Sequence, residues 1–354
     1  MDQFRLIIKC LQQTMALRAK DASFTTNDQV ISALNEQSQA HSEVISQIFS
    51  EISKSIVGQK DVVEKIMVAL ISDGHVLLES VPGLAKTLLA KTISDVLGVS
   101  TVRIQFTPDL LPADILGTKI YKKSSEQFDI EKGPIFNNFI LADEINRAPP
   151  KVQSALLEAM QEKQVTIHGE TFALSAPFLV MATQNPIESE GTYKLPDAQV
   201  DRFAMKILIS YPSIDDEKSI IARFASSNES LVNPVITSDK VIELQKFSQS
   251  IYVDESIINY VTRIVDATRN PQNYNLDLKN AIEFGASPRA SLWLIKTAKA
   301  LALIHGRGFV IPEDIKSVAH EVLRHRIILS FEADVNKISA DQIVDTILEN
   351  IQIS

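Results

Sequence analysis

The sequence predicts an α/β protein, in which a parallel sheet sandwiched by helices is followed by a helical domain. Three observations support this: short apolar runs alternate with helical patterns, a glycine-containing loop joins the first run to a helix, and strand signals largely stop after Pro212. Helical patterns at 86–97 and 151–162 separate the runs, and such alternation places helices on both faces of a parallel sheet. The strand-like runs cover residues 75–79, 102–106, 138–142, 178–183 and 206–209.

The chain is predicted to divide at two positions. Residues 1–40 form an N-terminal helical extension, with an apolar stripe at helical spacing and a connector rich in Ser, Thr, Asn and Gln. Residues 41–211 form the α/β domain, in which residues 164–172 alternate around His-Gly-Glu as in a β-hairpin. Residues 212–354 form the helical domain, with Ser339 capping its last helix. Its helical stripes cover 217–224, 241–247, 256–268, 290–305, 312–325 and 340–349.

Composition and charge exclude several classes of protein. The 354 residues are 45% hydrophobic and 22% charged, which is typical of globular domains with real cores. A formal net charge of −9 removes any global attraction to nucleic acid or to an anionic membrane. The single cysteine, Cys10, excludes an intrachain disulfide and a Cys-rich zinc site. Arg5 and Lys9 interrupt the N-terminal apolar patch, so we expect no signal peptide, no membrane anchor and a cytoplasmic location.

A loop that can bind phosphate follows the first strand. Residues 79–87 read Glu-Ser-Val-Pro-Gly-Leu-Ala-Lys-Thr and lead into a helix, so backbone N–H groups and a helix N-terminus can surround a polyphosphate. In this interpretation Lys86 contacts the β- and γ-phosphates of ATP, and the Thr87 hydroxyl ligates Mg²⁺. Ser80 and Ala85 replace the two glycines of the G-x-x-x-x-G-K-[ST] motif, so an ordinary strand-to-helix turn is the alternative.

Two carboxylates and an amide are expected at the same edge of the sheet. The apolar run 139–142 ends in Asp143 and Glu144, at the carboxyl end of a buried strand, where ligands of parallel sheets collect. Asp143 suits Mg²⁺, and Glu144 can polarise the water that attacks the γ-phosphate. Asn185 follows another strand and can hold that water or the γ-phosphate through its amide. The alternatives are an acidic loop start and a turn residue before Pro186.

Arginines can supply the positive charge that phosphoryl transfer needs. Arg202 lies just before the strand-like run 206–209, and Arg289 opens a helix of the C-terminal domain. Guanidinium groups at such places stabilise charge that develops on the γ-phosphate, but each arginine can equally form a surface salt bridge. Arg147, shortly after the acidic pair, is a further candidate.

From about Val44 to the C-terminus, the chain resembles the MoxR branch of the AAA+ ATPases. Seven segments follow that family's order: 79–87, 107–112, 132–136, 142–150, 153–162, 182–186, and 191–193 with 195–196. The resemblance implies a P-loop AAA+ fold with a helical lid, a helix-2 insert over residues 109–132, and a pre-sensor-1 hairpin over 164–172. In AAA+ relatives both of these face the central pore or the partner. Residues 1–40 fall outside the resemblance and are either an adaptor-docking arm or a flexible tail.

The same resemblance assigns roles to single residues. It implies that residues 56–59 lie against the adenine, and that the Cβ of Ser80 can alter the loop, whereas the family tolerates alanine at position 85. The implied roles are a Walker A motif at Lys86 and Thr87, a Walker B motif at Asp143 and Glu144, sensor 1 at Asn185, the arginine finger at Arg202 and sensor 2 at Arg289. The residues expected to bind nucleotide are Val57, Gly58, Pro82, Gly83, Leu84, Ala85, Lys86, Thr87, Leu88 and Asp143, with Thr87 and Asp143 on the Mg²⁺.

Partners are also implied by the resemblance. An arginine finger of this type reaches the nucleotide of the next subunit, so we expect a ring, usually a hexamer. ATP hydrolysis would then drive chaperone-like remodelling or maturation of a protein client, beside a partner that carries a von Willebrand factor A domain. One alternative is a nucleic-acid-associated AAA+ motor, which the acidic charge and the lack of a basic, aromatic-laced stripe disfavour. The other, which Ser80 leaves open, is a nucleotide-dependent scaffold without hydrolysis.

Overall fold

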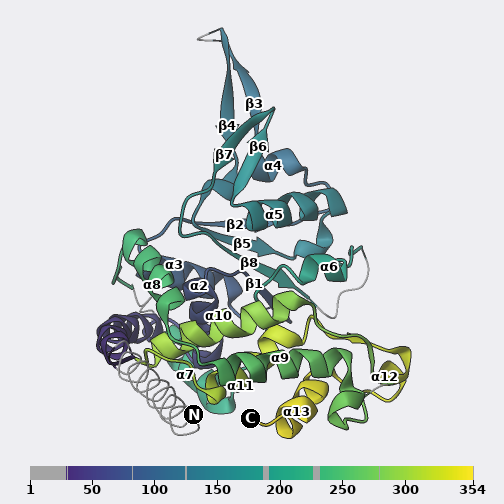
Figure 1. Ribbon diagram of the computed structural model, residues 1–354. Coiled ribbons are helices and arrows are strands. Elements are labelled where there is room, and N and C mark those ends of the chain that lie inside the picture. Colours follow the sequence, from purple (N-terminus) through teal and green to yellow (C-terminus); the bar gives the residue numbers. More distant parts are fainter. Residues whose placement is uncertain are drawn as a thin grey trace, which may run out of the picture.

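The computed structural model describes residues 29, 31–81, 83–123, 126–185, 191–225, 232–278 and 280–353 (Figure 1). Within them, a five-stranded parallel sheet has the order β2-β5-β8-β1-β9. Its strands begin at one edge, which we call the starting edge, and end at the other, the carboxyl edge. The predicted parallel sheet is confirmed, and each strand lies within one residue of its expected bounds. The strands are β1 (Val76–Ser80), β2 (Thr101–Gln105), β5 (Phe139–Asp143), β8 (Leu179–Gln184) and β9 (Met205–Ile209).

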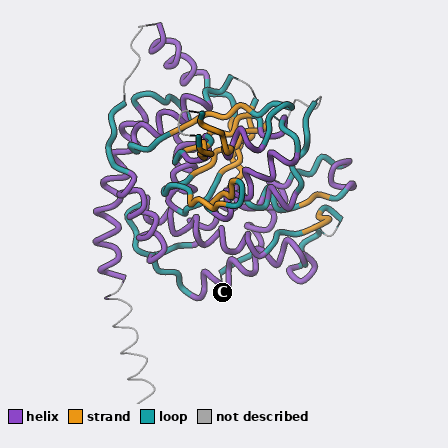
Figure 2. Tube along the Cα trace, turned by 90° about the horizontal axis from the view of Figure 1, so that it is seen from above, coloured by secondary structure: helices purple, strands orange, loops and turns teal. Residues whose placement is uncertain are grey.

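Alternate side chains of these strands build two hydrophobic cores, one on each face of the sheet. In β5 every residue is buried; Phe139 and Leu141 belong to one core, whereas Ile140 and Ala142 belong to the other. Successive residues of a strand point to opposite faces, so a strand covered on both sides is apolar throughout. Figure 2 shows the strands at the centre of the molecule with helices around them.

Helices cover both faces of the sheet, as the alternation predicts. α2 (Lys60–Ile71) and α3 (Lys86–Val96) contribute to the first core, and α5 (Pro150–Glu162) contributes to the second. Proline at the first position of α5 has the backbone angle that a helix start requires, and Lys163, in the left-handed conformation, ends the helix. The short elements are η1 (Pro134–Phe136), η2 (Ile145–Arg147) and α6 (Asp197–Val200).

Two β-hairpins project from the α/β domain on the side away from the helical domain (Figure 1). The expected insert contains α4 (Pro112–Leu116) and an antiparallel pair, β3 (Gly117–Lys122) and β4 (Gln127–Lys132). The predicted hairpin over 164–172 is confirmed as β6 (Gln164–Ile167) and β7 (Glu170–Ala173). His168 and Gly169 both have positive φ at its turn, as a two-residue hairpin turn requires.

The C-terminal part is helical, as predicted, and packs on the face of the sheet that α2 and α3 cover. One continuous core runs from Leu78 and Leu141 in the sheet to Leu294 and Ala298 in the C-terminal part. The sequence analysis missed a short antiparallel pair, β10 (Ile282–Phe284) with β11 (Ile328–Leu329), because two or three residues carry no readable alternation. The remaining elements are α7 (Ile214–Ala225), α8 (Ser238–Ser250), α9 (Glu255–Arg269), η3 (Pro271–Tyr274), α10 (Pro288–Ile304), α11 (Pro312–Leu323), α12 (Phe331–Val335) and α13 (Ala340–Asn350).

The N-terminal part differs from the expectation where the structure describes it. Residues 31–53 form one uninterrupted helix, so the polar connector expected before Val44 is helical in its described part. Most of its polar residues are exposed or half-buried, although Ser38 and Glu51 are buried, and Ile45, Ile48 and Ile52 are fully or almost fully buried. The Asn35 side chain accepts a hydrogen bond of 2.7 Å from the Gly308 N–H, which ties this helix to the helical domain. The apolar stripe of residues 4–15 lies outside the described residues.

Across the described ranges, we find no helix with the length and apolarity needed to span a bilayer.

Candidate functional site

The loop after β1 contains two residues in the left-handed conformation, at positions where the predicted phosphate-binding motif needs backbone freedom. Gly83 has a φ of 85° with open space where a side chain would stand, and Ala85 has a φ of 53°. The left-handed conformation costs an L-residue about 1 kcal/mol, which explains why the motif prefers glycine where this chain has Ala85. Leu84 is buried and anchors the loop in the core. Pro82 lies outside the described residues.

Ser80 departs from the motif without straining the backbone. It is the last residue of β1, remains extended, and pairs with Ile209 of β9. An extended residue accepts a Cβ at no cost, so the missing glycine does not distort the loop at this point. The Ser80 hydroxyl is buried and has no hydrogen-bond partner among the described residues, which leaves it available to a ligand of the loop.

The first turn of α3 is open to an anion. No side chain caps its N-terminus, and the first turn contains no acidic residue. The unpaired N–H groups and the positive end of the helix dipole therefore lack a negative partner, and Lys86 at the first position adds further positive charge. Lys86, Thr87 and Leu88 are at least partly exposed, so this end of the helix is accessible.

Asp143 is held at the carboxyl edge by a neighbouring strand on each side. From β2, Arg103 donates to Oδ2 at 3.0 Å from Nε and 2.7 Å from Nη2, and from β8, the Thr183 hydroxyl donates to Oδ1 at 2.6 Å. Asp143 is nearly buried, so these partners compensate its charge. The carboxylate and the Thr87 hydroxyl are the oxygen donors that Mg²⁺ prefers, and this donor set fits the metal.

Glu144 turns away from the strand in the left-handed conformation, with a φ of 58°. Its N–H donates to the Thr183 hydroxyl at 2.9 Å, so the hydroxyl links the two acidic residues. Its carboxylate accepts from Gln105 Nε2 at 2.8 Å and lies 3.2 Å from Arg147 Nε. A backbone strain of this kind persists where the surroundings fix it, and here it directs a carboxylate toward the carboxyl edge. Such a carboxylate can accept a proton from water.

Asn185 and the expected adenine-binding segment complete the set of predicted residues outside the phosphate loop and the acidic pair. Asn185 directly follows β8 and is nearly buried. Val57 and Gly58 lie in the linker before α2, where a side chain at Gly58 would collide with Asp216 of α7. The expected adenine-binding segment is therefore in contact with the first helix of the C-terminal part.

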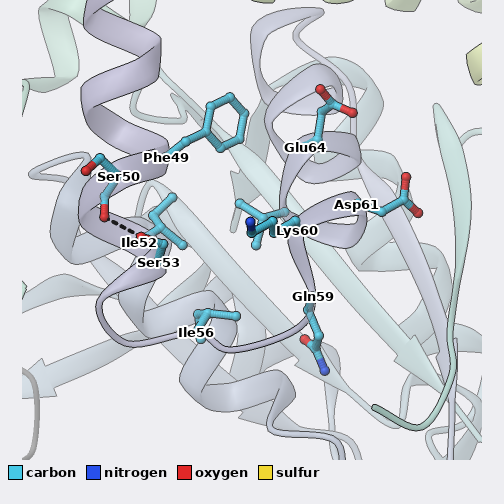
Figure 3. A pocket seen from close by; sticks show the side chains of 10 residues that line it. Phe49, Ser50, Ile52, Ser53, Ile56, Gln59, Lys60, Asp61 and Glu64 are labelled. Carbon is cyan, nitrogen blue, oxygen red and sulfur yellow. Dashed lines mark hydrogen bonds between the residues drawn. The ribbon is translucent and has the colours of Figure 1, made fainter. Parts of the chain in front are cut away.

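A cavity of about 540 Å³ adjoins this linker (Figure 3). It lies between the helix over residues 31–53 and α2, with Phe49, Ile52 and Ile56 as apolar lining and the Lys60 side chain near its centre. None of the described residues of the loop over 80–87 lines it, and neither do Val57 and Gly58. The cavity is therefore separate from the residues predicted to bind phosphate.

The two predicted arginines lie at the opposite edge of the sheet. Arg202 comes three residues before β9, at the starting edge, where the Ala204 N–H donates to the carbonyl of His75 before β1. Arg289, in the first turn of α10, donates from Nη1 to Asp201 Oδ2 at 3.2 Å. The structure therefore brings Arg202 and Arg289 together and separates both from Lys86. For Arg289, the salt bridge that the sequence left open is present.

Several polar residues of the two edges escaped the sequence analysis. Arg103 and Gln105 alternate with apolar residues in β2, and this period of two was the available signal. Thr183 was assigned to a strand but not to the site. The partner of Arg289, Asp201, carries no local signal, because the two residues are 88 positions apart in the chain.

Two family models match the chain. The model of the ATPase family associated with various cellular activities (AAA) matches residues 75–205, and that of the AAA lid domain matches residues 276–347. The first match begins just before β1 and ends at the start of β9, so it contains the loop over 80–87, the acidic pair, Asn185 and Arg202. The second covers much of the helical C-terminal part, which we therefore call the lid.

Related proteins and a solved structure match most of the chain. Chaperone MoxR1 of Mycobacterium tuberculosis is 50% identical over 85% of this chain and 80% of its own. YeaC of Bacillus subtilis is 42% identical over 88% and 95%, and protein MoxR of Methylorubrum extorquens is 30% identical over 79% and 86%. A crystal structure from Cytophaga hutchinsonii, described as a candidate ATPase, is 46% identical with a TM-score of 0.86, covering 92% of this chain and 99% of that one. Likeness at this level over whole chains shows common descent, and this chain belongs to the MoxR family of AAA ATPases.

Proposed function

We propose that this chain binds ATP with Mg²⁺ at the carboxyl edge of its sheet and hydrolyses it within a ring of identical subunits. The loop over 80–87 and the N-terminus of α3 would hold the phosphates, Val57 and Gly58 the adenine, and Thr87 and Asp143 the metal. Mg²⁺, when bound, supplies charge that neutralises the phosphates. Membership of the AAA ATPases supports nucleotide binding, and the geometry of the two edges supports the ring.

The separation of the two edges carries the proposal. β1 and β9 pair in parallel from Val76 with Met205 to Ser80 with Ile209. At about 3.3 Å per residue, the four steps from Val76 to Ser80 separate the start of the phosphate loop from the start of β9 by roughly 13 Å. Arg202, before β9, is therefore badly placed for the phosphates of its own subunit, and so is Arg289. Both are exposed enough to reach a neighbour, so a second copy supplies the complete site.

Within such a site, each residue of this chain has a separate task. Lys86 and the N–H groups of α3 bind and orient the phosphates. Glu144 orients the attacking water and accepts its proton, while Asn185 fixes the water or the γ-phosphate. Arg202 and Arg289 of the next subunit stabilise the charge that develops on the γ-phosphate. Hydrolysis therefore depends on assembly.

Mixing two inactive variants tests this arrangement. Glu144→Gln should retain ATP binding and assembly but lose turnover, because only the water-polarising carboxylate is lost. Arg202→Ala should lose turnover for a different reason and keep an intact site of its own. A mixture should therefore release phosphate faster than either variant, since one subunit provides the finger and the other the carboxylate. Normal hydrolysis by Glu144→Gln, or no gain in any mixture, would contradict the proposal.

Assembly itself needs an independent measurement. Sedimentation of the wild type with ATP and Mg²⁺ should show a ring-sized species, with a hexamer as the expected state, and its formation should parallel the rise in specific activity with protein concentration. Full specific activity in a monomer would contradict the dependence on a neighbour.

For the work that hydrolysis drives, we propose remodelling or maturation of a protein client. The hairpin β3–β4 exposes an aromatic pair, Tyr121 and Phe128, with rings 5.2 Å apart, which the sequence analysis overlooked. Exposed aromatic residues at a projecting tip are typical of protein-binding surfaces. The adjacent lysines are less suited to nucleic acid, because Lys122 pairs with Asp129 and Lys119 with Glu170.

Client capture tests this part of the proposal. Glu144→Gln with ATP should hold clients longer than the wild type, and Tyr121→Ala combined with Phe128→Ala should release them. Co-purification of proteins, including any with a von Willebrand factor A domain, is the measurement. Tight binding of duplex or single-stranded nucleic acid that weakens steeply with salt would instead favour the nucleic-acid motor.

A further inference from the structure

The lid holds the segment that carries the arginine finger. Directly after α11, three consecutive basic residues contact the backbone of residues 201–206. Arg324 Nη1 donates to the Lys206 carbonyl at 3.1 Å, and His325 Nε2 lies 3.2 Å from the Phe203 carbonyl. Arg326 makes the most contacts of the three. These interactions join the lid to the stretch from Asp201 to Lys206, which leads from α6 into the start of β9.

Arg326 is completely buried, and its hydrogen bonds are fully satisfied. Nε donates to Asp201 Oδ1 at 2.8 Å, and Nη2 donates to the carbonyls of Asp201 and Phe203 at 3.1 and 2.6 Å. Nη1 donates to the carbonyls of Ala204, at 3.2 Å, and Val322. A guanidinium has five N–H donors, and here each has an acceptor. Burial lowers the pKa of Arg326 to about 10, against the opposing effect of Asp201, so the group is charged at neutral pH.

Asp201 connects this guanidinium to the start of α10. Besides Arg326, its carboxylate accepts from the Ser287 hydroxyl at 3.1 and 3.0 Å and from Arg289 Nη1 at 3.2 Å. Ser287 is also the N-cap of α10, because its hydroxyl accepts from the Arg289 N–H. The Asp201 carboxylate therefore binds the start of α10, through Ser287 and Arg289, and also binds Arg326, three residues after the end of α11.

Arg202 itself contributes little to its own placement. Among the described residues, no hydrogen bond or ion pair holds its guanidinium, and its N–H donates to the Gln199 carbonyl at 3.2 Å. The direction of this side chain is therefore set by the backbone of residues 201–204, and that backbone is what Arg326 binds.

We infer that Arg326, together with Asp201, is a positioning residue for the arginine finger: it fixes Arg202 to the lid, so that movement of the lid in one subunit changes the site of the next. This inference rests on the proposed role of Arg202 in a neighbouring site. A lysine cannot replace Arg326, because an ammonium has three donors in place of a planar set of five. Misplacing a catalytic group by about 1 Å costs roughly 100-fold in rate.

The test is Arg326→Lys, which keeps the charge opposite Asp201. We expect unchanged ATP affinity, because its own phosphate loop is intact, and a kcat roughly 100-fold below the wild type. Mixing it with Glu144→Gln should restore turnover, since the Glu144→Gln subunit has a well-placed finger for the intact site of its neighbour. Unchanged kcat, or a loss of kcat that mixing does not restore, would overturn the inference.

Two controls separate the positioning role of Arg326 from the proposed finger role of Arg202. Arg202→Ala mixed with Glu144→Gln reports on the finger itself: a gain there without a gain for Arg326→Lys would reject the positioning role alone. No gain in either mixture would reject the neighbouring finger. Arg307→Lys is the matched substitution, because Arg307 forms a bidentate pair with Asp314 within the lid at 2.5 and 2.8 Å. Mixing Arg307→Lys with Glu144→Gln should not restore any lost turnover, because Arg307 pairs within the lid and does not bind the backbone of residues 201–206.

If Arg326→Lys does not fold, a milder variant tests the positioning role. Ser287→Ala removes one donor from Asp201 and a helix cap, and should lower kcat by about threefold to tenfold, with partial recovery on mixing with Glu144→Gln. Ser339→Ala removes a similar cap from α13, where the Ser339 hydroxyl accepts from the Gln342 N–H at 3.2 Å. An equal loss of kcat in both serine variants, or no recovery on mixing for Ser287→Ala, would attribute the effect to folding alone.

Discussion

The functional residues at the carboxyl edge of the sheet could be predicted from the sequence far better than those at the starting edge. At the carboxyl edge, each functional residue directly follows its own strand: the phosphate loop follows β1, Asp143 ends β5, and Asn185 follows β8. At the starting edge, the arginines depend on contacts with the lid, formed by residues that are far apart in the chain. The difference shows that local sequence order sets the residues that we propose to bind nucleotide, whereas tertiary packing sets those that we propose to serve a neighbour.

The largest expected effect breaks the carboxyl edge alone. Lys86→Ala should abolish measurable ATP binding and turnover, because the phosphate loop then loses the positive side chain that the proposal places on the β- and γ-phosphates. The lid and the starting edge should remain folded. The measurements are nucleotide titration and thermal unfolding of the same preparation, and undiminished ATP affinity would remove the phosphate loop from the proposed site.

The matching change at the starting edge should separate binding from catalysis. Arg202→Ala should lower kcat by roughly 1,000-fold, the scale of an arginine finger, and leave the affinity of each subunit for ATP unchanged. Nucleotide titration and steady-state phosphate release measure the two quantities. Equal losses of affinity and kcat would place Arg202 in its own subunit's site and would remove the contrast between the edges.

Arg289→Ala sharpens the comparison further, because the structure pairs Arg289 with Asp201. If Arg289 serves the neighbouring nucleotide with Arg202, its loss should lower kcat by about 10- to 100-fold and should be restored by mixing with Glu144→Gln. A loss of turnover that no mixture restores would show that Arg289 acts on the nucleotide of its own subunit, which requires the lid to move away from Asp201.

Local sequence patterns predicted most of the fold and the carboxyl edge, but they did not predict contacts between distant parts of the chain. The order of strands and helices followed from alternating apolar patterns, and the paired carboxylates followed from their place at the end of a buried strand. The connector expected before Val44 is helical over residues 31–43, where polar residues obscure the helical pattern, and β10 with β11 is too short to show a period. The role of Asp201 could not be predicted, because in the chain it resembles any acidic residue beside an arginine. Only packing places it against Ser287 and Arg326.

A smaller effect on turnover should come from Gln105, which distinguishes the two carboxylates within the carboxyl edge. Gln105 donates to Glu144, whereas Arg103 donates to Asp143. Gln105→Ala should lower kcat by about threefold to tenfold at unchanged ATP affinity, because Glu144 loses one of the groups that orient it. A rise in basal hydrolysis would instead show that Gln105 restrains Glu144 in the nucleotide-free state.

Acidity should affect the starting edge without direct involvement of the nucleotide. His75, before β1, is buried; its Nδ1 accepts from the Val180 N–H at 3.1 Å and its Nε2 lies 3.0 Å from the Met160 carbonyl. Burial lowers the pKa of His75 to about 4, and burial also places the pKa of His325 well below 6.5. Both groups are neutral in the folded protein, and the unfolded chain takes up their protons below its histidine pKa of about 6.5.

Stability should therefore be complete above pH 6.5 and should fall as the pH decreases from 6.5 toward 4. For His75 alone, the difference between the two pKa values corresponds to about 3 kcal/mol at the acid end of this range. His75→Gln keeps a donor near the Met160 carbonyl but removes the titrating group, so the free energy of unfolding should depend less on pH than in the wild type, although it is lower at pH 8. Denaturant unfolding at pH 8 and pH 5 measures the difference. An identical change between these pH values in both proteins would show that protonation of His75 does not contribute to the acid sensitivity of the starting edge.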